Sequence, residues 1–465
     1  MQGNHTTDFK IGQVRVDFTK KHMTPYGGFV FIAKFFENIG LKEAVESFIP
    51  ITEASNNSMG IYPKVLSFFL MTLAGGKRFS HLVCLDHSLE VFRKLFDQLK
   101  LPKAPTTITR FFGKIKSWQK MEEMSDKLWS YLFGIIPWDG ITEDYISFDS
   151  SVITRYGNQE GAKKGYNPKK RGRPSHHPIF GFLSSSRYIV NAWNRAGNAC
   201  SAENIIDFAR QTFLRLGNRL KILGVLCDAS FYAKHFIDFL ENLNHKYVIA
   251  VKFYRTIQEK IVSLENWEKV DDKDDIEIAE FVFCHSAEGW IHPRRYFVVR
   301  HRVKEDCPMP VGKQLNLFPD LEEVNEYRYS VYVTNYDDDA TQLWRLYRRR
   351  CDDENRIKEI KEDFGLEGYC MQNFYATEAA ILLRILLYNL FNLFRSILLP
   401  KAKHHSRLST ILYQYFTIPG ILGSDGNRKI LRIGLSSKKQ RGKFKYLLHK
   451  VARWFPPPRG EPQCI

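Results

Sequence analysis

The spacing of apolar residues divides the chain into a helical first part and a mixed second part. Between residues 24 and 135, four segments place apolar side chains three or four positions apart, as amphipathic helices do. Thr106 or Thr107 would cap the fourth of them. An all-helical domain over residues 1–140 is therefore predicted. The four segments are GFVFIAKFFENIG, PKVLSFFLMTLAGG, HSLEVFRKLFDQLKL and TTITRFFGKIKSWQKM.

The fourth predicted helix carries positive charge along one side. Arg110 and Lys114 stand beside the apolar Ile108 and Phe111. A helix of this kind could contact the backbone of DNA or enter a groove. A bundle helix whose outer face is basic has the same pattern, so both interpretations stay open.

From residue 141 onward, apolar and polar residues begin to alternate, as they do in β-strands. YISFDSSVI (145–153) alternates, with Ile146 and Phe148 on one face and Asp149 on the other, which predicts a half-buried strand. Two helices are predicted at 201–217, capped by Ser201, and at 230–244. The further predicted strands are HPIFGFLSSSRYIVNAWNRAGN (177–198, two strands), KILGVLCDAS (221–230), KYVIAVKF (246–253) and EYRYSVYVTN (326–335).

This order of elements predicts an α/β domain with a break in it. Residues 141–253 and 326–400 form the two parts of the predicted core, and the acidic, β-rich text of 254–325 forms an insertion. Residues 401–465 follow as a helical, basic region with 14 Lys and Arg against two acids. The apolar stretch at 379–394 is interrupted by Arg384, which predicts a buried helix rather than a membrane span.

Charge narrows the class of partner. The chain has 68 Lys and Arg against 51 Asp and Glu, a net charge of +17, which favours a polyanion such as nucleic acid. Hydrophobic residues make up 44%, as in folded globular proteins. Eight cysteines occur without a CxxC pair or a Cys/His cluster at zinc spacing. That argues against a zinc module or a disulfide scaffold and suits a reducing cytosol.

Two aspartates are candidates for chemistry. Asp149 lies in a strand whose other face is apolar, and Asp228 ends the most apolar strand, where α/β proteins usually bind ligands. Each also has a simpler interpretation. Asp149 could be a surface residue, and Asp228 could cap the helix that begins near Ser230.

A third acid lies in the segment YRRRCDDENRIKEIK (347–361). At about 100° per residue, Asp352 and Asp353 point away from Glu354 and are expected to be dispensable. A carboxylate among basic groups suits a site for metal and phosphate. Alternatively, Glu354 only forms ion pairs at i±4, worth ~0.3–0.5 kcal/mol each. One helical face carries Tyr347, Arg350, Glu354, Lys358 and Lys361.

These residues resemble a known signature. The spacing Y-x2-R-x3-E-x6-K is similar to the Y-R-E-K signature of DDE transposases from bacterial insertion sequences. FDSSV and CDASFY resemble the strands that carry the first and second Asp of that family, and VTN precedes its Glu helix. RYGNQEGAKKGYNPKKRGRPSHHP (155–178) and ENRIKEIKEDFGLEG (354–368) resemble one subgroup of it. Ser147 departs from the pattern, because many relatives carry a second Asp there.

The resemblance implies a ribonuclease H-like catalytic core and a metal-dependent reaction. Asp149, Asp228 and Glu354 would bind two Mg²⁺ ions, for which Mn²⁺ can substitute. Tyr347, Arg350 and Lys361 would hold DNA phosphates, and the helical face adds Lys358. Water would first nick the end of the element, and the freed 3′-OH would then attack target DNA. A hairpin intermediate is also allowed.

The implied partners are double-stranded DNA, as terminal inverted repeats and as target, and a second copy of the chain in a synaptic homodimer. The implied location is the bacterial cytoplasm, on the nucleoid, with no membrane partner. Two alternatives stay open: a ribonuclease H-like nuclease without strand transfer, and a domesticated DNA-binding protein without catalysis. The acid triad argues against the second.

Two further features are candidate DNA contacts. A loop at 163–173 has six positive charges and no acid, which predicts a backbone clamp, although a flexible exposed loop has the same composition. Trp290 could stack on an unpaired base or simply pack. The six basic residues are Lys163, Lys164, Lys169, Lys170, Arg171 and Arg173.

Overall fold

The computed structural model describes residues 9–16, 18–53, 58–271, 275–302, 327–369 and 371–458. The chain divides into two compact units, Met1–Phe111 with Phe394–Phe455, and Phe112–Leu393 with Pro456–Ile465. Residues 1–111 of the predicted helical domain lie in the first unit with most of the predicted basic region, whereas residues 112–140 lie in the second. Residues 303–325 of the predicted insertion and 459–465 of the basic region lie outside the described residues.

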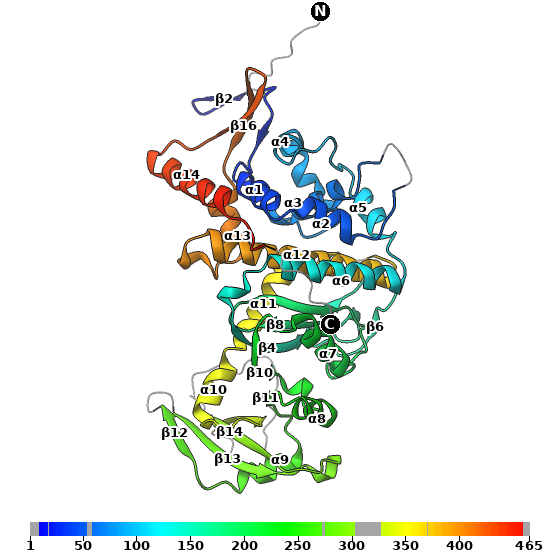
Figure 1. Ribbon diagram of the computed structural model, residues 1–465, viewed down its shortest axis with the longest axis vertical. Helices are drawn as coiled ribbons and strands as arrows, with labels where there is room; N and C mark the ends of the chain where they lie inside the picture. Colours follow the sequence, from blue (N-terminus) through cyan, green and yellow to red (C-terminus); the bar gives the residue numbers. More distant parts are fainter. Residues whose placement is uncertain are drawn as a thin grey trace, which may run out of the picture. The chain divides into compact units, whose positions relative to one another are not determined.

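The first unit is built mainly of short helices (Figure 1), which enclose an aromatic core. Phe29, Phe35 and Phe68 are buried in it. The prediction missed α2, because a single left-handed Gly40 separates it from α1. The helices are α1 (Phe29–Asn38), α2 (Leu41–Phe48), α3 (Tyr62–Leu73) and α4 (Leu89–Leu95).

The C-terminal part of this unit pairs with its N-terminal part. Strand β16 (Gly420–Asp425) pairs with β17 (Arg428–Ile433) and with β3 (Met23–Thr24). The short helix α13 (Leu408–Ile411) precedes the hairpin, and α14 (Lys438–Arg453) follows it. A separate hairpin joins β1 (Phe9–Ile11) to β2 (Val14–Val16).

The fourth predicted helix is interrupted in the structure. Helix α5 (Pro105–Phe112) ends before Gly113, and α6 (Trp118–Ile135) begins after it. Ser117 caps α6 by accepting a hydrogen bond from the Lys120 backbone N–H. The cap predicted at Thr106 or Thr107 was wrong, since α5 begins before both residues.

The second unit contains a nine-stranded mixed sheet in the order β12-β13-β14-β15-β11-β10-β4-β8-β9. Strands β4, β10 and β11 are parallel to one another. Strand β8 pairs with β4 in antiparallel orientation, and β9 pairs with β8 in antiparallel orientation. The strands are β4 (Glu143–Ser150), β8 (Ile179–Leu183), β9 (Ile189–Trp193), β10 (Lys221–Cys227), β11 (Tyr247–Ala250), β12 (Glu268–Asp271), β13 (Ile276–Phe283), β14 (Arg294–Arg302) and β15 (Tyr327–Thr334).

The predicted insertion extends the sheet of the core. Strand β14 pairs with β15 over eight residues, and Phe297 of β14 shares a hydrophobic cluster with Leu226 of β10. Helix α9 (Arg255–Val262) leads into this part. Trp290 is buried, with its ring 5.0 Å from that of Tyr232 and 4.8 Å from the Arg294 guanidinium. Trp290 therefore packs, as the simpler interpretation held.

Strand β4 is covered on both faces, so the prediction of a half-buried strand was wrong. Phe148 packs against Phe208 of α7 (Ile205–Leu216) and Phe236 of α8 (Lys234–Asn242). Ser147, on the other face, is also fully buried. The cap of α7 is Asn204, in a left-handed conformation, and not the predicted Ser201.

The segment predicted as one charged helix contains two. Helix α10 (Ala340–Arg348) ends just before Arg349, and α11 (Cys351–Glu362) begins just after Arg350. Helix α12 (Phe374–Leu398) follows; by length and composition it could cross a membrane, but its apolar window is 89% buried in the protein. Its Arg384 lies 3.8 Å from the centre of the Tyr369 ring. The prediction of a buried helix at 379–394 agrees with this packing.

Candidate active site

Asp149 and Asp228 lie side by side at the carboxyl ends of two parallel strands. Phe148 of β4 is paired with Cys227 of β10, so the residue that follows each of them stands at the same edge of the sheet. Ligands of open α/β sheets bind at this edge. The position is set by the strand register alone.

Each aspartate has one oxygen held by the backbone N–H of a residue that follows it. The Ser150 N–H donates to Oδ1 of Asp149 at 2.8 Å, and the Ser230 N–H donates to Oδ1 of Asp228 at 2.9 Å. Asp228 thereby caps the 3-10 turn Ala229–Phe231. The capping interpretation is therefore true, but it accounts for only one oxygen of Asp228.

The other oxygen of each aspartate faces the same cation. Nη2 of Arg350 lies 3.3 Å from Oδ2 of Asp149 and 3.8 Å from Oδ2 of Asp228. Arg350 and Asp149 are both buried. A surface role for Asp149 is thus excluded, and the two carboxylates form one charged group with Arg350.

Burial and charge shift the pKa values in this group. Burial raises the pKa of Asp149 to about 7; Arg350 opposes the rise, and Asp228 adds to it. Burial would lower the pKa of Arg350, but Asp149, Tyr347 and Asp228 raise it overall. Arg350 therefore stays charged, while Asp149 changes its protonation near neutral pH.

Tyr347 and Lys361 reach the same end of the sheet. The Tyr347 hydroxyl donates to the Cys227 carbonyl at 3.1 Å, and burial raises its pKa. Lys361 Nζ donates to the Val152 carbonyl at 2.8 Å and lies 3.1 Å from Glu367. Burial lowers the pKa of Lys361, while Glu367 and Asp149 raise it. Three of the five residues of the predicted face therefore adjoin the two aspartates.

Glu354 and Lys358 remain apart from this group. Both are exposed on α11, and neither has an ion-pair partner among the residues that the structure describes. The alternative in which Glu354 only pairs with Arg350 and Lys358 is therefore not what the structure shows. Within the described ranges, no set of three acidic, His or Cys residues is close enough to hold a metal ion.

Asp353 has a structural position that the helical wheel did not indicate. Its side chain is fully buried and lies 3.1 Å from Nη1 of Arg356, which is also fully buried. Arg356 donates to the carbonyl of Leu183 at the end of β8 and to that of Ser184 just after it. Burial raises the pKa of Asp353, with Arg356 and Ser147 opposing. Asp353 therefore has a structural role that the helical wheel did not predict, and Asp352 is the second, partly exposed partner of Arg356 at 3.1 Å.

The basic loop is anchored at its base and charged at its surface. Strands β5 (Ile153–Thr154), β6 (Lys163–Lys164) and β7 (Pro174–His176) form a small sheet. Buried Asn167 donates to the Thr154 hydroxyl at 3.1 Å. The flexible-loop alternative is thus disfavoured. All six basic residues, Lys163, Lys164, Lys169, Lys170, Arg171 and Arg173, are exposed.

Two neighbours of the site had no clear sequence signal. His177 is buried, and its Nδ1 lies 2.7 Å from the Ala199 carbonyl. Burial lowers its pKa, and Lys361 and Asp228 are among the charges that act on it. Arg195 donates to the His177 carbonyl at 3.0 Å. Neither residue stands at a recognisable spacing from the aspartates, so only the fold brings them together.

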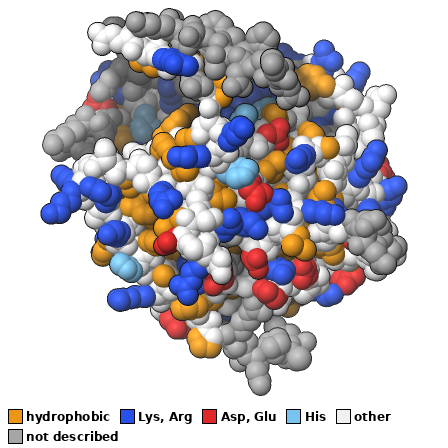
Figure 2. Space-filling model, turned by 90° about the horizontal axis from the view of Figure 1, so that it is seen from above, with side chains coloured by type: hydrophobic (Ala, Val, Ile, Leu, Met, Phe, Trp, Pro, Cys, Tyr) orange, Lys and Arg blue, Asp and Glu red, His pale blue; other side chains and the backbone are white. Residues whose placement is uncertain are grey.

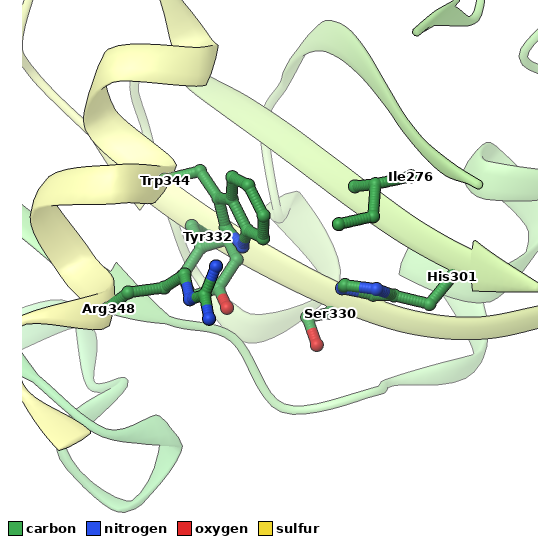
Figure 3. A pocket seen from close by; sticks show the side chains of 6 residues that line it. All are labelled: Ile276, His301, Ser330, Tyr332, Trp344 and Arg348. Atoms are coloured by element: carbon green, nitrogen blue, oxygen red, sulfur yellow. The ribbon is translucent and has the colours of Figure 1, made fainter. Parts of the chain in front are cut away.

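Two basic residues and one pocket that lie apart from the two aspartates in the chain are further candidate sites. Arg110 on α5 and Lys114 after it are exposed, which is compatible with either interpretation of that segment. A pocket of about 400 Å³ opens where α10 meets the sheet, and in it Trp344 and Arg348 of α10 face Tyr332 of β15 (Figure 3). It contains no acid, so it lacks the ligands of a hard cation. Its lining residues are Ile276, His301, Ser330, Tyr332, Trp344 and Arg348.

The two aspartates fit a divalent cation. Their donors are hard carboxylate oxygens, and a positive group already lies against both free Oδ2 atoms in the form of the Arg350 guanidinium. Burial and, to a smaller extent, the neighbouring Asp228 raise the pKa of Asp149, so a cation bound to this pair would be favoured. Glu354 is a third oxygen donor on the adjoining helix, although it does not contact the pair.

Comparison with known families is decisive at this point. The family described as Transposase DDE domain group 1 matches residues 7–454. The chain belongs to this family. It is therefore a DDE transposase, an enzyme class that cuts and joins DNA strands and uses divalent metals.

A solved structure is also similar in outline. It is the cryo-EM structure of a piggyBac transposase synaptic complex with hairpin DNA, at 12% sequence identity and a TM-score of 0.43. The match covers 96% of this chain and 89% of the other chain. No curated protein matches the sequence.

Metal binding should depend on pH through Asp149. Because the pKa of this carboxyl is about 7, a divalent ion must displace a proton below that pH. We expect the apparent Kd for Mn²⁺, measured on the DNA-free protein by electron paramagnetic resonance, to fall about tenfold per pH unit between pH 5.5 and 7 and then to level off. Asp149→Asn should remove the dependence. A flat profile in the wild-type protein would show that Asp149 is not a ligand.

Proposed function

We propose that the chain is the transposase of a bacterial insertion sequence, which binds terminal inverted repeats, cuts the DNA and joins the freed 3′-OH to target DNA. The observation that carries this proposal is the pair Asp149 and Asp228, each with one oxygen held by the backbone N–H of a residue that follows it and the other presented at the sheet edge. The antiparallel strands β9, β8 and β4, with β10 and β11 added parallel to β4, support the ribonuclease H-like assignment of this core.

Asp149, Asp228 and Glu354 would hold the divalent ions, Mg²⁺ with Mn²⁺ as a substitute. When bound, such ions neutralise charge on the scissile phosphate and activate the attacking oxygen. Glu354 is exposed and has no ion-pair partner in the described structure, so its carboxylate is available. It lies on the helical face that also carries Lys361, whose Nζ reaches the β4 end of the sheet.

Arg350 would change partners when the site is loaded. Its guanidinium lies against Asp149 and Asp228 and balances their charge. Where these carboxylates hold a divalent ion, Arg350 would be available as a bidentate donor for a DNA phosphate. Tyr347 and Lys361 would fix the phosphates on either side, and exposed Lys358 would add a point charge.

The basic loop would hold the DNA backbone beside the reacting phosphate. In support of this proposal, Lys169 is one of the charges that lower the pKa of Lys361, after burial. Arg110 and Lys114 would contribute contacts from the helical region. The route would be cut-and-paste, with a hairpin intermediate permitted, carried out by a synaptic homodimer on the bacterial nucleoid.

Glu354 provides the test of this site. With an inverted repeat taken from the DNA that flanks the gene, Glu354→Gln should bind as the wild type does but nick at least about a thousandfold more slowly, since a lost metal ligand removes several kcal/mol of stabilisation. Glu362→Gln, exposed further along α11, is the matched control and should nick normally. Substantial nicking by Glu354→Gln would remove this residue from the site.

A further inference from the structure

Helix α14 carries an unusual excess of positive charge. Its sixteen residues include seven Lys and Arg and no acid. All of the seven except Lys450 are exposed. The adjoining β17 adds exposed basic side chains, and the face that Figure 2 shows has Lys and Arg side chains spread across its described part. The seven are Lys438, Lys439, Arg441, Lys443, Lys445, Lys450 and Arg453.

The helix is fixed to its unit by its apolar side. Leu447 and Val451 are buried, and the Phe444 ring lies 4.6 Å from that of Phe31 on α1. The Asn38 side chain donates to the carbonyls of Val451 and Trp454 at 2.9 and 2.7 Å. The orientation of the helix is therefore set by packing, with the basic side chains turned to solvent.

The charges are not neutralised within the protein. None of the seven side chains forms an ion pair with the residues described. Lys439 with Lys443, and Arg441 with Lys445, are like charges four positions apart, a spacing that destabilises a helix. The first turn holds cations and no acid, against the preference of the helix dipole. Local stability therefore does not explain this sequence, whereas an anionic partner does.

We propose that α14 and the β16–β17 hairpin form a binding surface for the backbone of duplex DNA, which here is called the α14 surface. This inference rests on the proposed function for the identity of the polyanion. A helix of sixteen residues is about 24 Å long, so its basic side chains can contact several phosphates along one side of a DNA duplex. Gly442 lies in the middle of α14 with open space around it, which lets a phosphate approach the helix backbone.

The test is the salt dependence of binding. Lys439, Arg441, Lys443 and Lys445 are changed together to Gln, which keeps helix propensity. The slope of log K against log salt for inverted-repeat DNA should fall by about 0.9 for each phosphate that the variant no longer neutralises, so by about 2 to 4 in total. The matched control changes four exposed lysines elsewhere in the same unit to Gln and should leave the slope nearly unchanged. They are Lys42, Lys94, Lys100 and Lys103.

Four outcomes are informative. A reduced slope in the α14 variant alone supports the α14 surface. An unchanged slope, or an equal reduction in the control, overturns it. Loss of binding to anionic vesicles without loss of DNA binding also overturns it, in favour of a membrane partner. If the wild-type chain binds no inverted-repeat DNA, the proposed function fails first, and the two failures are thereby distinguished.

Discussion

Asp149→Asn and Asp228→Asn should each reduce nicking of inverted-repeat DNA by at least about a thousandfold. Asparagine keeps an oxygen that can accept the hydrogen bond from Ser150 or Ser230, but it removes the charge that binds a divalent ion. Loss of metal-based stabilisation of several kcal/mol corresponds to this fall in rate. The measurement is single-turnover nicking of a labelled DNA end with saturating protein.

Measurements of DNA binding distinguish the loss of a metal ligand from misfolding or loss of the DNA substrate. Both variants should bind the DNA end with the affinity of the wild type. Asp207→Asn, an exposed aspartate paired with Arg210 on α7, makes the same chemical change away from the site and should nick normally. If either active-site variant kept more than about a tenth of the wild-type rate, the assignment of that residue as a metal ligand would be wrong.

The second large effect concerns stability and falls on Arg356 and Asp353. Both side chains are fully buried and lie 3.1 Å apart, and Arg356 also pairs with the partly exposed Asp352 at 3.1 Å. Arg356→Ala should lower the free energy of unfolding by about 3–5 kcal/mol, measured by urea denaturation, because it leaves Asp353 without its buried counter-charge. Asp353→Ala should lower it by less, because Arg356 keeps Asp352. Asn355→Ala, at the exposed position between them, should change it by less than about 0.5 kcal/mol. A decrease under about 1 kcal/mol for both buried variants would show that the pair is not structural.

The catalytic strands were predictable because they carry strong local patterns. The apolar run 221–227 and the alternating run around Phe148 each define a strand, and Asp228 and Asp149 follow from them. The parallel register that brings the two together is a property of the fold. That β4 is buried on both faces could not be predicted, since its second face is covered by polar and charged groups of α11, more than 200 residues away in the chain.

The helical wheel predicted directions but not partners. It set Arg350, Lys361 and Glu354 on one face, but only Arg350 and Lys361 reach the end of the sheet, while Glu354 is exposed. It could not indicate that Arg350 would lie against two aspartates, or that Asp353 would be buried beside Arg356. Both outcomes depend on which elements pack around the helix, and burial changes an ion pair from a weak surface contact into a structural requirement.

The central claim is that this site joins DNA as well as cutting it. The direct measurement supplies a pre-cleaved inverted-repeat end with a free 3′-OH and a plasmid target in Mg²⁺ or Mn²⁺, and separates the products on a gel. We predict a joined product for the wild-type protein and none for Asp149→Asn. Nicking of uncut ends without any joined product in either metal would contradict the claim and would identify the protein as a nuclease.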